Sequence, residues 1–430
     1  MATAVSSVAD ICRSAKAASR TLAGLDSRVK DAALEAIAVA LQERVQEILQ
    51  ANERDMQAGG ENEIGEALLD RLRLDEPRVL SIAGAVRQIA ALADPVGELI
   101  EGRRLANGLD VRKVRVPLGV VAVVYEARPN VTIDAAALCL KSGNAIVLRG
   151  SSTAAHSNAV LAQIASEAAV AAGLPRDCVS LVAGGGRDEL AELARQNDSV
   201  DLIIPRGGEG LKDALQAVAT VPVIYAASGN CHVYVDATAA LEQAEAIVLN
   251  AKTQRPGVCN AAETLLVHEG VAARFLPRIV DALQAAGVLV RADERTLALV
   301  AGAGQPHPDD ADALQRADEE DWASEYLAMT LAVRVVDSVQ EAIEHISRYG
   351  SGHSEAIVTR DTASARAFQL GVDAACVYVN ASTRFTDGGE FGMGAEIGNS
   401  TQKLHVRGPI GLRELCTFKY LVEGDGHVRG

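Results

Sequence analysis

The sequence contains few aromatic residues, no C-x-x-C pair and no long hydrophobic run. Phe, Trp and Tyr make up 3% of the 430 residues, so a core must be built from Ala, Val, Leu and Ile. Hydrophobic residues make up 49% of the chain, which is sufficient to form a core. No apolar run is long enough to span a membrane, and Met1–Ala23 carries Asp, Lys and Arg without a central hydrophobic segment. We therefore expect a cytoplasmic protein with no membrane partner.

Metal-ligand and disulfide spacings are also missing. The seven cysteines are odd in number and widely separated, and the eight histidines form no H-E-x-x-H or similar pattern. The net charge of −16 argues against a nucleic-acid partner, because phosphate backbones are bound by clustered Lys and Arg. We expect no metal, no disulfide framework and no nucleic acid.

What the sequence does contain is a helical start followed by two alternating blocks. Leu34, Ile37, Leu41, Val45 and Ile48 recur at helical spacing, and a second helical segment follows Pro77. Short apolar runs then alternate with Ala-rich stretches of helical length, which predicts parallel sheets covered on both faces. The predicted strands of the first block are 111–126, 144–149, 178–184, 200–204 and 221–226, and those of the second are 231–236, 264–268, 331–336, 355–359 and 375–379.

Cys259 stands in an unusual context, KTQRPGVCNAAET (252–264). Pro256 and Gly257 interrupt regular structure just before it, whereas Cys139 and Cys376 lie in apolar runs typical of a core. A thiolate here could attack a carbonyl group, and Arg255 could help to lower the pKa of the thiol if it faced the sulfur. The local pattern leaves both a nucleophile and a packed cysteine open.

Two strand ends carry polar or glycine-rich turns. In IIPRGGEGL (203–211), Gly207 and Gly208 precede a helical pattern, which fits either phosphate binding at a helix N-terminus or an ordinary turn. In EARPN (126–130), Asn130 fits a local helix cap or an amide that donates to a developing oxyanion.

A polar cluster occurs in YGSGHSEAI (349–357). Ser351 and His353 lie there in a Gly-containing loop before a predicted strand. The cluster fits a polar turn, or a site that holds a small charged substrate.

Several long motifs occur in one order between residues 116 and 412. They include RPNVTIDAAALCLKSGNAIVLRGS, IIPRGG, GNCHVYVD, QRPGVCNAAETLLVH, RYGSGHSEAI and EFGMGAEIGNSTQKLHVRGPIGL. By these motifs the sequence resembles the gamma-glutamyl phosphate reductases, or glutamate-5-semialdehyde dehydrogenases, of the aldehyde dehydrogenase superfamily. The resemblance implies an α/β fold of the aldehyde dehydrogenase type, with a Rossmann-like cofactor domain, an α/β catalytic domain and a small β extension for oligomerisation.

The resemblance also assigns roles to residues. It makes Cys259 the nucleophile, and it places Asn130 at the oxyanion-hole asparagine that acts with the backbone N–H of the cysteine. Gly207 and Gly208 take the place of a Gly-Ser pair beside the pyrophosphate of the cofactor.

Three further residues of the cofactor site follow from the resemblance. Arg149 lies where many relatives have a lysine that contacts the adenosine ribose, and Glu325 lies where a glutamate binds the nicotinamide ribose. Ser152 replaces an acidic residue of NAD-preferring relatives. A neutral side chain there would not repel a 2′-phosphate, which favours NADPH as the cofactor.

One departure from the superfamily bears on the reaction. Hydrolytic members carry a glutamate that activates water, and the corresponding segment YAASGNCH (225–232) contains no acid. The resemblance therefore implies reduction of L-glutamyl 5-phosphate to L-glutamate 5-semialdehyde through a cysteine thioester, in proline biosynthesis. The alternatives are a hydrolytic semialdehyde dehydrogenase, a thiol acyltransferase without a nicotinamide cofactor, and a non-catalytic scaffold.

The resemblance divides the chain into three parts. Residues 1–106 with 127–228 and 385–413 would bind NADPH, 229–384 would carry the nucleophile, and 107–126 with 414–430 would form the extension. The extension implies a homo-oligomer. Arg255, Ser351 and His353 are candidates for binding the amino-acid part of the substrate, and a transient contact with glutamate 5-kinase is a candidate partnership.

Overall fold

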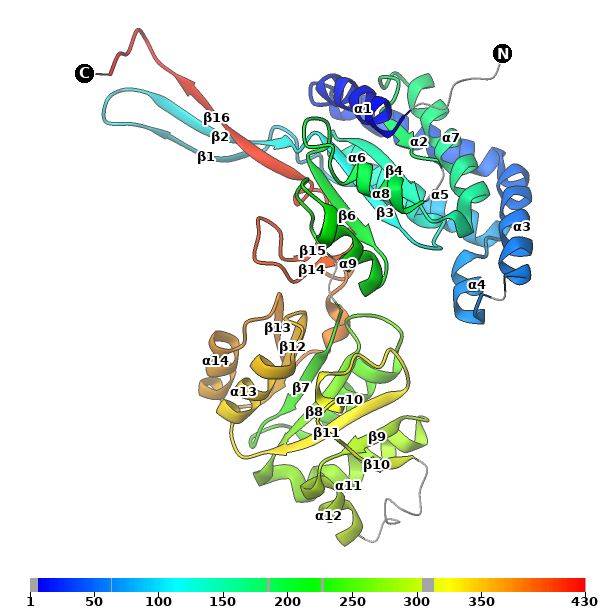
Figure 1. The fold of residues 1–430 in the computed structure, drawn as a ribbon. Coiled ribbons are helices and arrows are strands. Elements are labelled where there is room, and N and C mark those ends of the chain that lie inside the picture. The colour runs from blue at the N-terminus through cyan, green and yellow to red at the C-terminus, as the bar shows by residue number, and fades with distance from the viewer. Residues whose placement is uncertain (1–6, 63, 184–185, 226–227, 304–312, 430) are drawn as a thin grey trace. The chain divides into compact units, whose positions relative to one another are not determined.

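The computed structural model describes residues 7–62, 64–183, 186–225, 228–303 and 313–429. The chain forms two compact units (Figure 1). The first comprises residues 1–226, 392–398 and 410–430, and the second comprises 227–391 and 399–409. Each unit contains its own parallel sheet.

The first unit begins with helices, as the sequence predicts. The pattern from Leu34 to Ile48 spans two of them, because α2 ends at Glu43 and α3 begins at Val45. Pro77 lies in the first turn of α5, where its missing N–H costs no helical hydrogen bond, and Asp75 caps this helix by accepting from the Arg78 N–H. The helices of the unit are α1 (Val8–Leu22), α2 (Ser27–Glu43), α3 (Val45–Glu61), α4 (Glu66–Leu72), α5 (Glu76–Ala91), α6 (Asn130–Lys141), η1 (Ser152–Ala154), α7 (Ala155–Ala171), α8 (Arg187–Leu193) and α9 (Glu209–Val218).

A four-stranded parallel sheet lies among these helices in the order β5-β4-β3-β6. Its strands are β3 (Val120–Tyr125), β4 (Ala145–Gly150), β5 (Val179–Leu181) and β6 (Leu202–Arg206). Every residue of β3 and β4 is buried, which explains why these strands are continuous apolar runs rather than alternating ones. The chain leaves β3 toward β4 and later returns to its other side as β6, so the order reverses beside β3.

A separate antiparallel sheet projects from the first unit (Figure 1). It has the order β1-β2-β16 and consists of β1 (Leu99–Arg104), β2 (Asp110–Pro117) and β16 (Cys416–Glu423). We call these three strands the β-arm. The β-arm is close to the expected extension but differs in its bounds: β1 belongs to it, whereas 120–125 forms the buried strand β3. Strand β2 carries four charged side chains and β3 carries none, so the change in composition coincides with the boundary between them.

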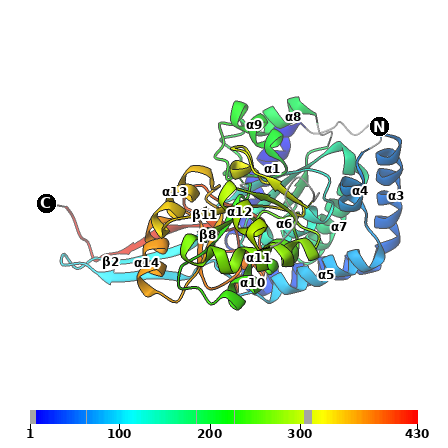
Figure 2. The same ribbon diagram turned by 90° about the horizontal axis from the view of Figure 1, so that it is seen from below.

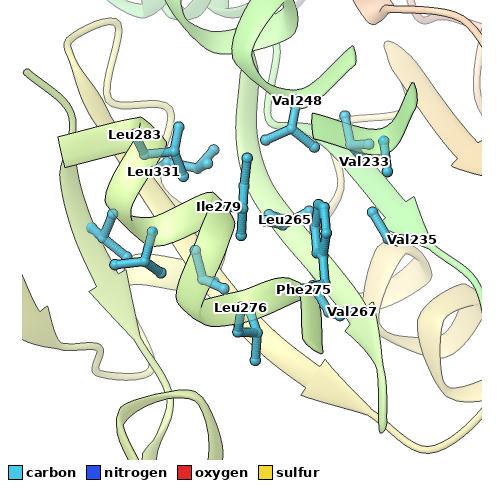
Figure 3. Close-up of a cluster of buried hydrophobic side chains, with 14 of the residues drawn as sticks. Val233, Val235, Val248, Leu265, Val267, Phe275, Leu276, Ile279, Leu283 and Leu331 are labelled. Carbon is cyan, nitrogen blue, oxygen red and sulfur yellow. The ribbon is translucent and has the colours of Figure 1, made fainter. Parts of the chain in front are cut away.

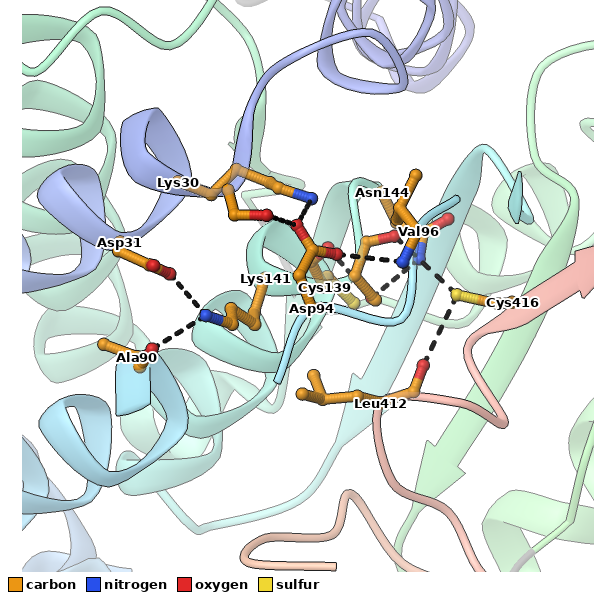
Figure 4. A network of polar contacts seen from close by, with 12 residues as sticks. Lys30, Asp31, Ala90, Asp94, Val96, Cys139, Lys141, Asn144, Leu412 and Cys416 are labelled. Atoms are coloured by element: carbon orange, nitrogen blue, oxygen red, sulfur yellow. Dashed lines mark hydrogen bonds and ion pairs between the residues drawn. The ribbon is translucent and has the colours of Figure 1, made fainter. Parts of the chain in front are cut away.

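Two lysines of the first unit are almost completely buried, and both are paired (Figure 4). Lys30 forms an ion pair with Asp94, and Lys141 forms one with Asp31 and also donates to the Ala90 carbonyl at 2.7 Å. Burying an ammonium group without such partners would cost several kcal/mol. These pairs therefore tie α2 and α6 to the end of α5.

The second unit has a seven-stranded parallel sheet in the order β10-β9-β11-β8-β7-β12-β13. Its strands are β7 (Cys231–Val235), β8 (Ala262–His268), β9 (Leu289–Ala292), β10 (Leu314–Arg316), β11 (Thr330–Val336), β12 (Ser354–Val358) and β13 (Cys376–Val379). A separate antiparallel pair follows them in the chain and consists of β14 (Asn399–Ser400) and β15 (Gly408–Pro409). Its helices are α10 (Leu241–Thr253), α11 (Glu269–Ala285), α12 (Glu294–Gly302), η3 (Asp321–Ala323), α13 (Val339–Tyr349), α14 (Thr362–Gly371) and η4 (Thr383–Phe385).

Both faces of this sheet are buried. Val233, Val235 and Leu265 point to the cluster formed with α10 and α11, which pack against each other (Figures 2 and 3). Tyr234 and Leu266, one position along the same strands, join a second cluster with α13 and α14. The period-2 alternation of a strand therefore divides one apolar run between two cores.

One predicted strand is absent. Within the described part of 221–226, Val223 forms a single parallel bridge with Ile203 and no strand follows. Pro222 interrupts this run and has no N–H to continue a ladder. The observed units also differ from the expected domain bounds near the C-terminus, because residues 385–391 and 399–409 belong to the second unit.

Candidate active site

Cys259 lies in the loop between α10 and β8. Helix α10 ends at Thr253, just before the Pro256-Gly257 pair. All seven cysteines are described; six of them are buried, and Cys259 is partly exposed. Its surroundings therefore differ from those of a core cysteine.

A buried ion pair closes the base of this loop. Lys252 Nζ donates to Glu263 Oε2 at 2.5 Å, and neither side chain is exposed. Burial raises the pKa of Glu263 and lowers that of Lys252, while the attraction between the two opposes both changes. Glu263 also accepts from the Leu327 N–H at 3.3 Å. The pair joins the end of α10 to the start of β8 on either side of Cys259.

The segment that enters β7 passes directly over the backbone of Cys259. A Cβ atom at Gly229 would lie 1.5 Å from the Cys259 carbonyl oxygen, so no other residue fits there. The Gly229 N–H donates to Glu325 Oε1 at 2.6 Å, and the Cys231 thiol donates to the Cys259 carbonyl at 3.2 Å. Sequence reasoning missed this role of Gly229, although the glycine next to Asn230 and Cys231 was visible in the motif.

Asn260, which follows Cys259, fixes a second segment beside the loop. Its buried Nδ2 donates to the carbonyls of Thr386 at 2.9 Å and Arg384 at 3.3 Å, and its own carbonyl accepts from Thr383 Oγ1 at 2.7 Å. These bonds hold η4 and the residues after it against the Cys259 loop.

Arg384 brings a positive charge to this region. Its side chain is partly buried, and its Nε donates to Gln254 Oε1 at 2.8 Å. Burial and the charge of Arg255 lower the pKa of the Arg384 guanidinium, whereas charges at Asp387, Cys259 and Cys231 act in the opposite direction. Sequence reasoning did not single out Arg384, because no local motif connects it with Cys259.

His353 lies behind Cys231 rather than at the surface. It is buried, with its Nδ1 2.8 Å from Ser354 Oγ and 3.9 Å from Cys231 Sγ. Burial lowers the pKa of His353 to about 4, so the ring is neutral at pH 7. Among the described residues, His353 Nε2 and Ser351 Oγ are buried without a hydrogen-bond partner.

These residues share one edge of the seven-stranded sheet. Cys231 pairs with Ala262 at the start of β7 and β8, and Ser354 pairs with Cys376 at the start of β12 and β13. Cys259, Gly229 and His353 immediately precede these starts, which places them at the amino edge of the sheet.

The cofactor candidates of the first unit lie at the carboxyl edge of the other sheet. Tyr125, at the end of β3, pairs with Gly150 of β4 and with Arg206 of β6, so the loops after these three strands begin side by side. The strand order reverses beside β3, and the crevice at such a reversal is the usual ligand site of an open parallel sheet.

Gly207 and Gly208 connect β6 to α9 and are exposed. The Gly208 N–H donates to the Glu126 carboxylate at 3.2 Å, and a Cβ at Gly207 would lie 2.7 Å from the Glu126 carboxyl carbon. A backbone N–H just before α9 is thus bonded to a carboxylate of the chain itself.

Arg149 lies near the end of β4, and Ser152 follows that strand. Arg149 is buried at the end of the strand, donates from Nη2 to the Gly186 carbonyl at 2.9 Å, and has its pKa lowered by burial. Ser152 begins η1 and is exposed.

Asn130 is the first residue of α6, and the interpretation as a cap is wrong. The N-cap position is Pro129, which makes no side-chain cap, and Asn130 Nδ2 donates to Asp134 Oδ2 at 2.9 Å. Burial raises the pKa of Asp134 to about 6, against the effects of Asn130 and Arg206. Among the described residues, the second Nδ2–H of Asn130 has no acceptor.

Comparison with known proteins places this geometry in a family. The sequence pattern of the aldehyde dehydrogenase family matches residues 2–298. The gamma-glutamyl phosphate reductase of Moorella thermoacetica is 55% identical over 415 residues, covering 96% of this chain and 97% of that protein. The chain belongs to the gamma-glutamyl phosphate reductase family, within the aldehyde dehydrogenases.

Further relatives agree with this assignment. The gamma-glutamyl phosphate reductase of Thermobifida fusca is 53% identical over 422 residues, which is 98% of each chain. The crystal structure of the Thermotoga maritima gamma-glutamyl phosphate reductase matches with a TM-score of 0.94 at 45% identity, covering 99% of this chain and 100% of that one. An acetylating aldehyde dehydrogenase from Geobacillus thermoglucosidasius shares the fold, with a TM-score of 0.69 at 22% identity.

Membership of the gamma-glutamyl phosphate reductase family implies a nicotinamide cofactor. The turn at Gly207 and Gly208 and the buried Arg149 fit the anionic part of such a molecule. Within the described ranges, no group of three His, Cys, Asp or Glu side chains is arranged as metal ligands would be. No described helix is both long enough and apolar enough to cross a bilayer.

Proposed function

We propose that this chain reduces L-glutamyl 5-phosphate to L-glutamate 5-semialdehyde and phosphate with NADPH, the second step of proline biosynthesis from glutamate. The observation that carries the proposal is the likeness to gamma-glutamyl phosphate reductases over nearly the whole chain. The partly exposed Cys259, held between Gly229 and Asn260, supplies the nucleophile.

The cysteine performs the covalent chemistry. The Cys259 thiolate attacks the acyl carbon, and the electron pair of the carbon–oxygen bond leaves with phosphate, so that a thioester remains on the sulfur. A cation near a thiol favours the thiolate, and Arg384 provides one. Reduction of the thioester then releases the aldehyde and restores the thiol.

Asn130 is assigned to the oxyanion, together with the Cys259 backbone N–H. The support within the first unit is the orientation of the amide. Asp134 accepts one Nδ2–H, which turns the nitrogen rather than the oxygen toward the carboxylate and leaves the other N–H available.

The amino-acid part of the substrate is assigned to Arg255, Ser351 and His353. The support is that Arg255 is exposed near Cys259 in sequence, and that buried polar atoms of Ser351 and His353 have no partner among the described residues. Such atoms are normally satisfied by a ligand or by water.

NADPH is assigned to Arg149, Ser152, Gly207, Gly208 and Glu325. When bound, the cofactor supplies the hydride. Gly207 and Gly208 would hold its pyrophosphate through backbone N–H groups, and the neutral, exposed Ser152 would tolerate a 2′-phosphate. Comparing kcat/KM for NADPH and NADH tests this preference, and equal values would contradict it.

The hydrolytic alternative is disfavoured by the segment 225–232. It contains no acid that could activate water beside Cys259, although residues 226–227 lie outside the described residues. Without such a base, the thioester is protected for reduction.

We further propose that the β-arm forms a homo-oligomer. β1 and β16 are its edge strands, and Leu99, Phe418, Tyr420 and Val422 are exposed on it. Exposed sheet edges with apolar side chains are normally covered by a partner.

A transient contact with glutamate 5-kinase and a cytoplasmic location complete the proposal. The acyl phosphate is labile, which favours direct transfer, and the seven cysteines are all free thiols, as a reducing compartment would maintain them. A coupled assay with hydroxylamine, which traps free acyl phosphate, tests the contact: undiminished flux supports it, and complete interception contradicts it.

The central experiment runs the reaction backwards, because the acyl phosphate is unstable. The protein is mixed with glutamate 5-semialdehyde and NADP⁺, with and without inorganic phosphate, and NADPH absorbance is followed. We expect strictly phosphate-dependent NADPH formation, and no activity in Cys259→Ala with an unchanged melting temperature. NADPH formation without phosphate would mean a hydrolytic enzyme, and substantial activity in Cys259→Ala would remove the cysteine from the mechanism.

A further inference from the structure

Two arginines near Cys259 have no carboxylate partner. Among the described residues, Arg384 makes one side-chain hydrogen bond, from Nε to Gln254, and its Nη1 and Nη2 make none. Neither Arg384 nor Arg255 takes part in any ion pair described for the chain, whereas Lys252, in the last turn of α10, is paired with Glu263. Asp387 attracts Arg384 through its charge but forms no ion pair with it, so the Nη groups of Arg384 are left without a direct carboxylate contact among the described residues.

Arg384 is held in place from both ends. Asn260 binds its carbonyl, the adjacent Thr383 binds the Asn260 carbonyl, and Gln254 binds its Nε. Gln254 and Asn260 lie in the loop that carries Cys259, so the guanidinium is fixed relative to the sulfur by that loop itself. The Arg384 guanidinium is planar, its Nε is fixed, and its Nη groups have no partner among the described residues. It can therefore donate hydrogen bonds to two oxygens of one anion.

Placing the Arg384 charge here costs free energy, and a bound anion would reduce that cost. Partial burial removes water from the Arg384 guanidinium, and Arg255 adds repulsion from a like charge. A desolvated charge is unfavourable unless an opposite charge compensates it. A bound anion would remove both penalties.

The substrate offers two anions, and their distances from the reacting carbon differ. The phosphate is bonded through oxygen to the carbon that Cys259 attacks, whereas the α-carboxylate lies at the far end of the glutamyl chain. Arg384 is attached to the Cys259 loop through the residue next to the cysteine. The nearer anion, the phosphate, therefore fits this position better.

We propose that Arg384 binds the phosphoryl group of the acyl phosphate and stabilises it as it leaves. The proposal rests on the proposed function and adds the residue that recognises the leaving group. As the sulfur–carbon bond forms, the carbon–oxygen bond breaks, and its electron pair moves to the phosphate oxygen. The Arg384 Nη–H groups donate to the phosphate oxygens on which this charge accumulates.

The test measures KM for phosphate and KM for glutamate 5-semialdehyde separately in the reverse reaction. We expect Arg384→Gln to raise KM for phosphate by about tenfold to one-hundredfold, as loss of charge-assisted hydrogen bonds would, and to leave KM for the semialdehyde within about twofold. Arg384→Lys keeps the charge without the fork and should recover part of the loss. Arg366→Gln, an exposed arginine on α14, is the matched control and should leave both constants unchanged.

Other results would overturn the proposal. A selective rise in KM for the semialdehyde would assign Arg384 to the carboxylate. Unchanged KM values with a shifted pH profile of Cys259 alkylation by iodoacetamide would assign it to the thiolate. If Arg384→Gln fails to fold, Arg384→Lys decides. An unchanged KM for phosphate in a folded Lys variant would show that the guanidinium does not bind the phosphoryl group through paired hydrogen bonds. A wild-type reaction that needs no phosphate would instead contradict the proposed function itself.

Discussion

The backbone of Cys259 lies so close to position 229 that only glycine fits there. The entry to β7 crosses the Cys259 carbonyl so closely that even a methyl group at position 229 would overlap it. The same segment supplies the N–H that Glu325 accepts and the thiol that binds the Cys259 carbonyl. The position of the nucleophile is therefore set by packing of backbone against backbone.

We expect Gly229→Ala to lower kcat/KM by at least about one-hundredfold, because displacement of a reacting group by about 1 Å has an effect of that size. Steady-state kinetics measures it. The control is Gly302→Ala, at the end of α12, where an added Cβ meets nothing within 4 Å and activity should be unchanged. Wild-type activity in Gly229→Ala would show that the loop can move aside freely.

His353 predicts a pH dependence of stability. Its pKa is about 4 in the folded chain because of burial, against 6.5 ordinarily, so between these values the unfolded chain binds a proton that the folded chain does not. The free energy of unfolding should therefore fall as the pH decreases from about 6.5 to about 4. His345, whose pKa is lowered by burial to about 2, adds a separate contribution of the same sign.

His353→Gln should make this decrease shallower by up to about 1.4 kcal/mol per pH unit, the value for one proton. Urea denaturation between pH 4.5 and 7.5 measures the slope. The exposed His405 provides the control variant His405→Gln. An unaltered slope in His353→Gln would show that His353 binds its proton equally well in both states.

At the scale of elements, the second unit shows how parallel strands collect a site. Strands β7, β8, β12 and β13 start at one edge, and the segments before them carry Gly229, Cys259 and His353. The sheet can hold this edge steady because both of its faces are buried. The packing of α10 and α11 on one face is thus part of what positions the nucleophile (Figure 3).

Phe275 on α11 tests that packing. It is fully buried in the cluster with Val233, Val235 and Leu265, and we expect Phe275→Ala to reduce the free energy of unfolding by about 3–5 kcal/mol, from lost burial and the resulting cavity. Urea denaturation followed by circular dichroism measures the change. The adjacent, exposed Arg274→Ala should change it by no more than about 0.5 kcal/mol. A similarly small effect of Phe275→Ala would mean that the cluster repacks without a cavity.

At the scale of the whole molecule, the β-arm exposes three apolar side chains on one face of its edge strand β16, with the Lys113 ammonium of β2 over the Phe418 ring. Phe418, Tyr420 and Val422 alternate along β16 with Thr417 and Lys419, so the two sets face opposite sides. A monomer would leave this face in water, and a second copy could cover it.

We expect the wild-type chain to have an oligomer mass by light scattering at micromolar concentration. Phe418→Glu with Tyr420→Glu should reduce that mass, because charges would be buried at the interface. Thr417→Glu with Lys419→Glu, on the other face, is the matched control. A wild-type monomer, or equal effects of the two double variants, would contradict an interface on the face of Phe418 and Tyr420.

Much of this protein could be read from its sequence. The strand runs and the helical spacing predicted both α/β blocks, since period and apolar content are local properties. The motifs around Cys259, Gly207 and Asn130 identified the family, because several long patterns in one order are specific. The sequence placed Asn130 at a helix start but could not show whether its amide caps the helix, since that depends on the acceptor at Asp134.

Only the tertiary structure brought Arg384 and Gly229 to Cys259. The three residues are far apart in the chain, and no local pattern relates them. Gly229 and Cys259 meet because β7 and β8 align their starts at one edge of the sheet and because Gly229 fits the backbone of the loop, whereas Arg384 is held there by the bond from Asn260 to its carbonyl in η4. The sequence by itself determined which chemical groups the chain carries and how each segment folds locally; the packing of the second unit decided which of those groups surround the nucleophile, because that proximity depends on strand order and burial.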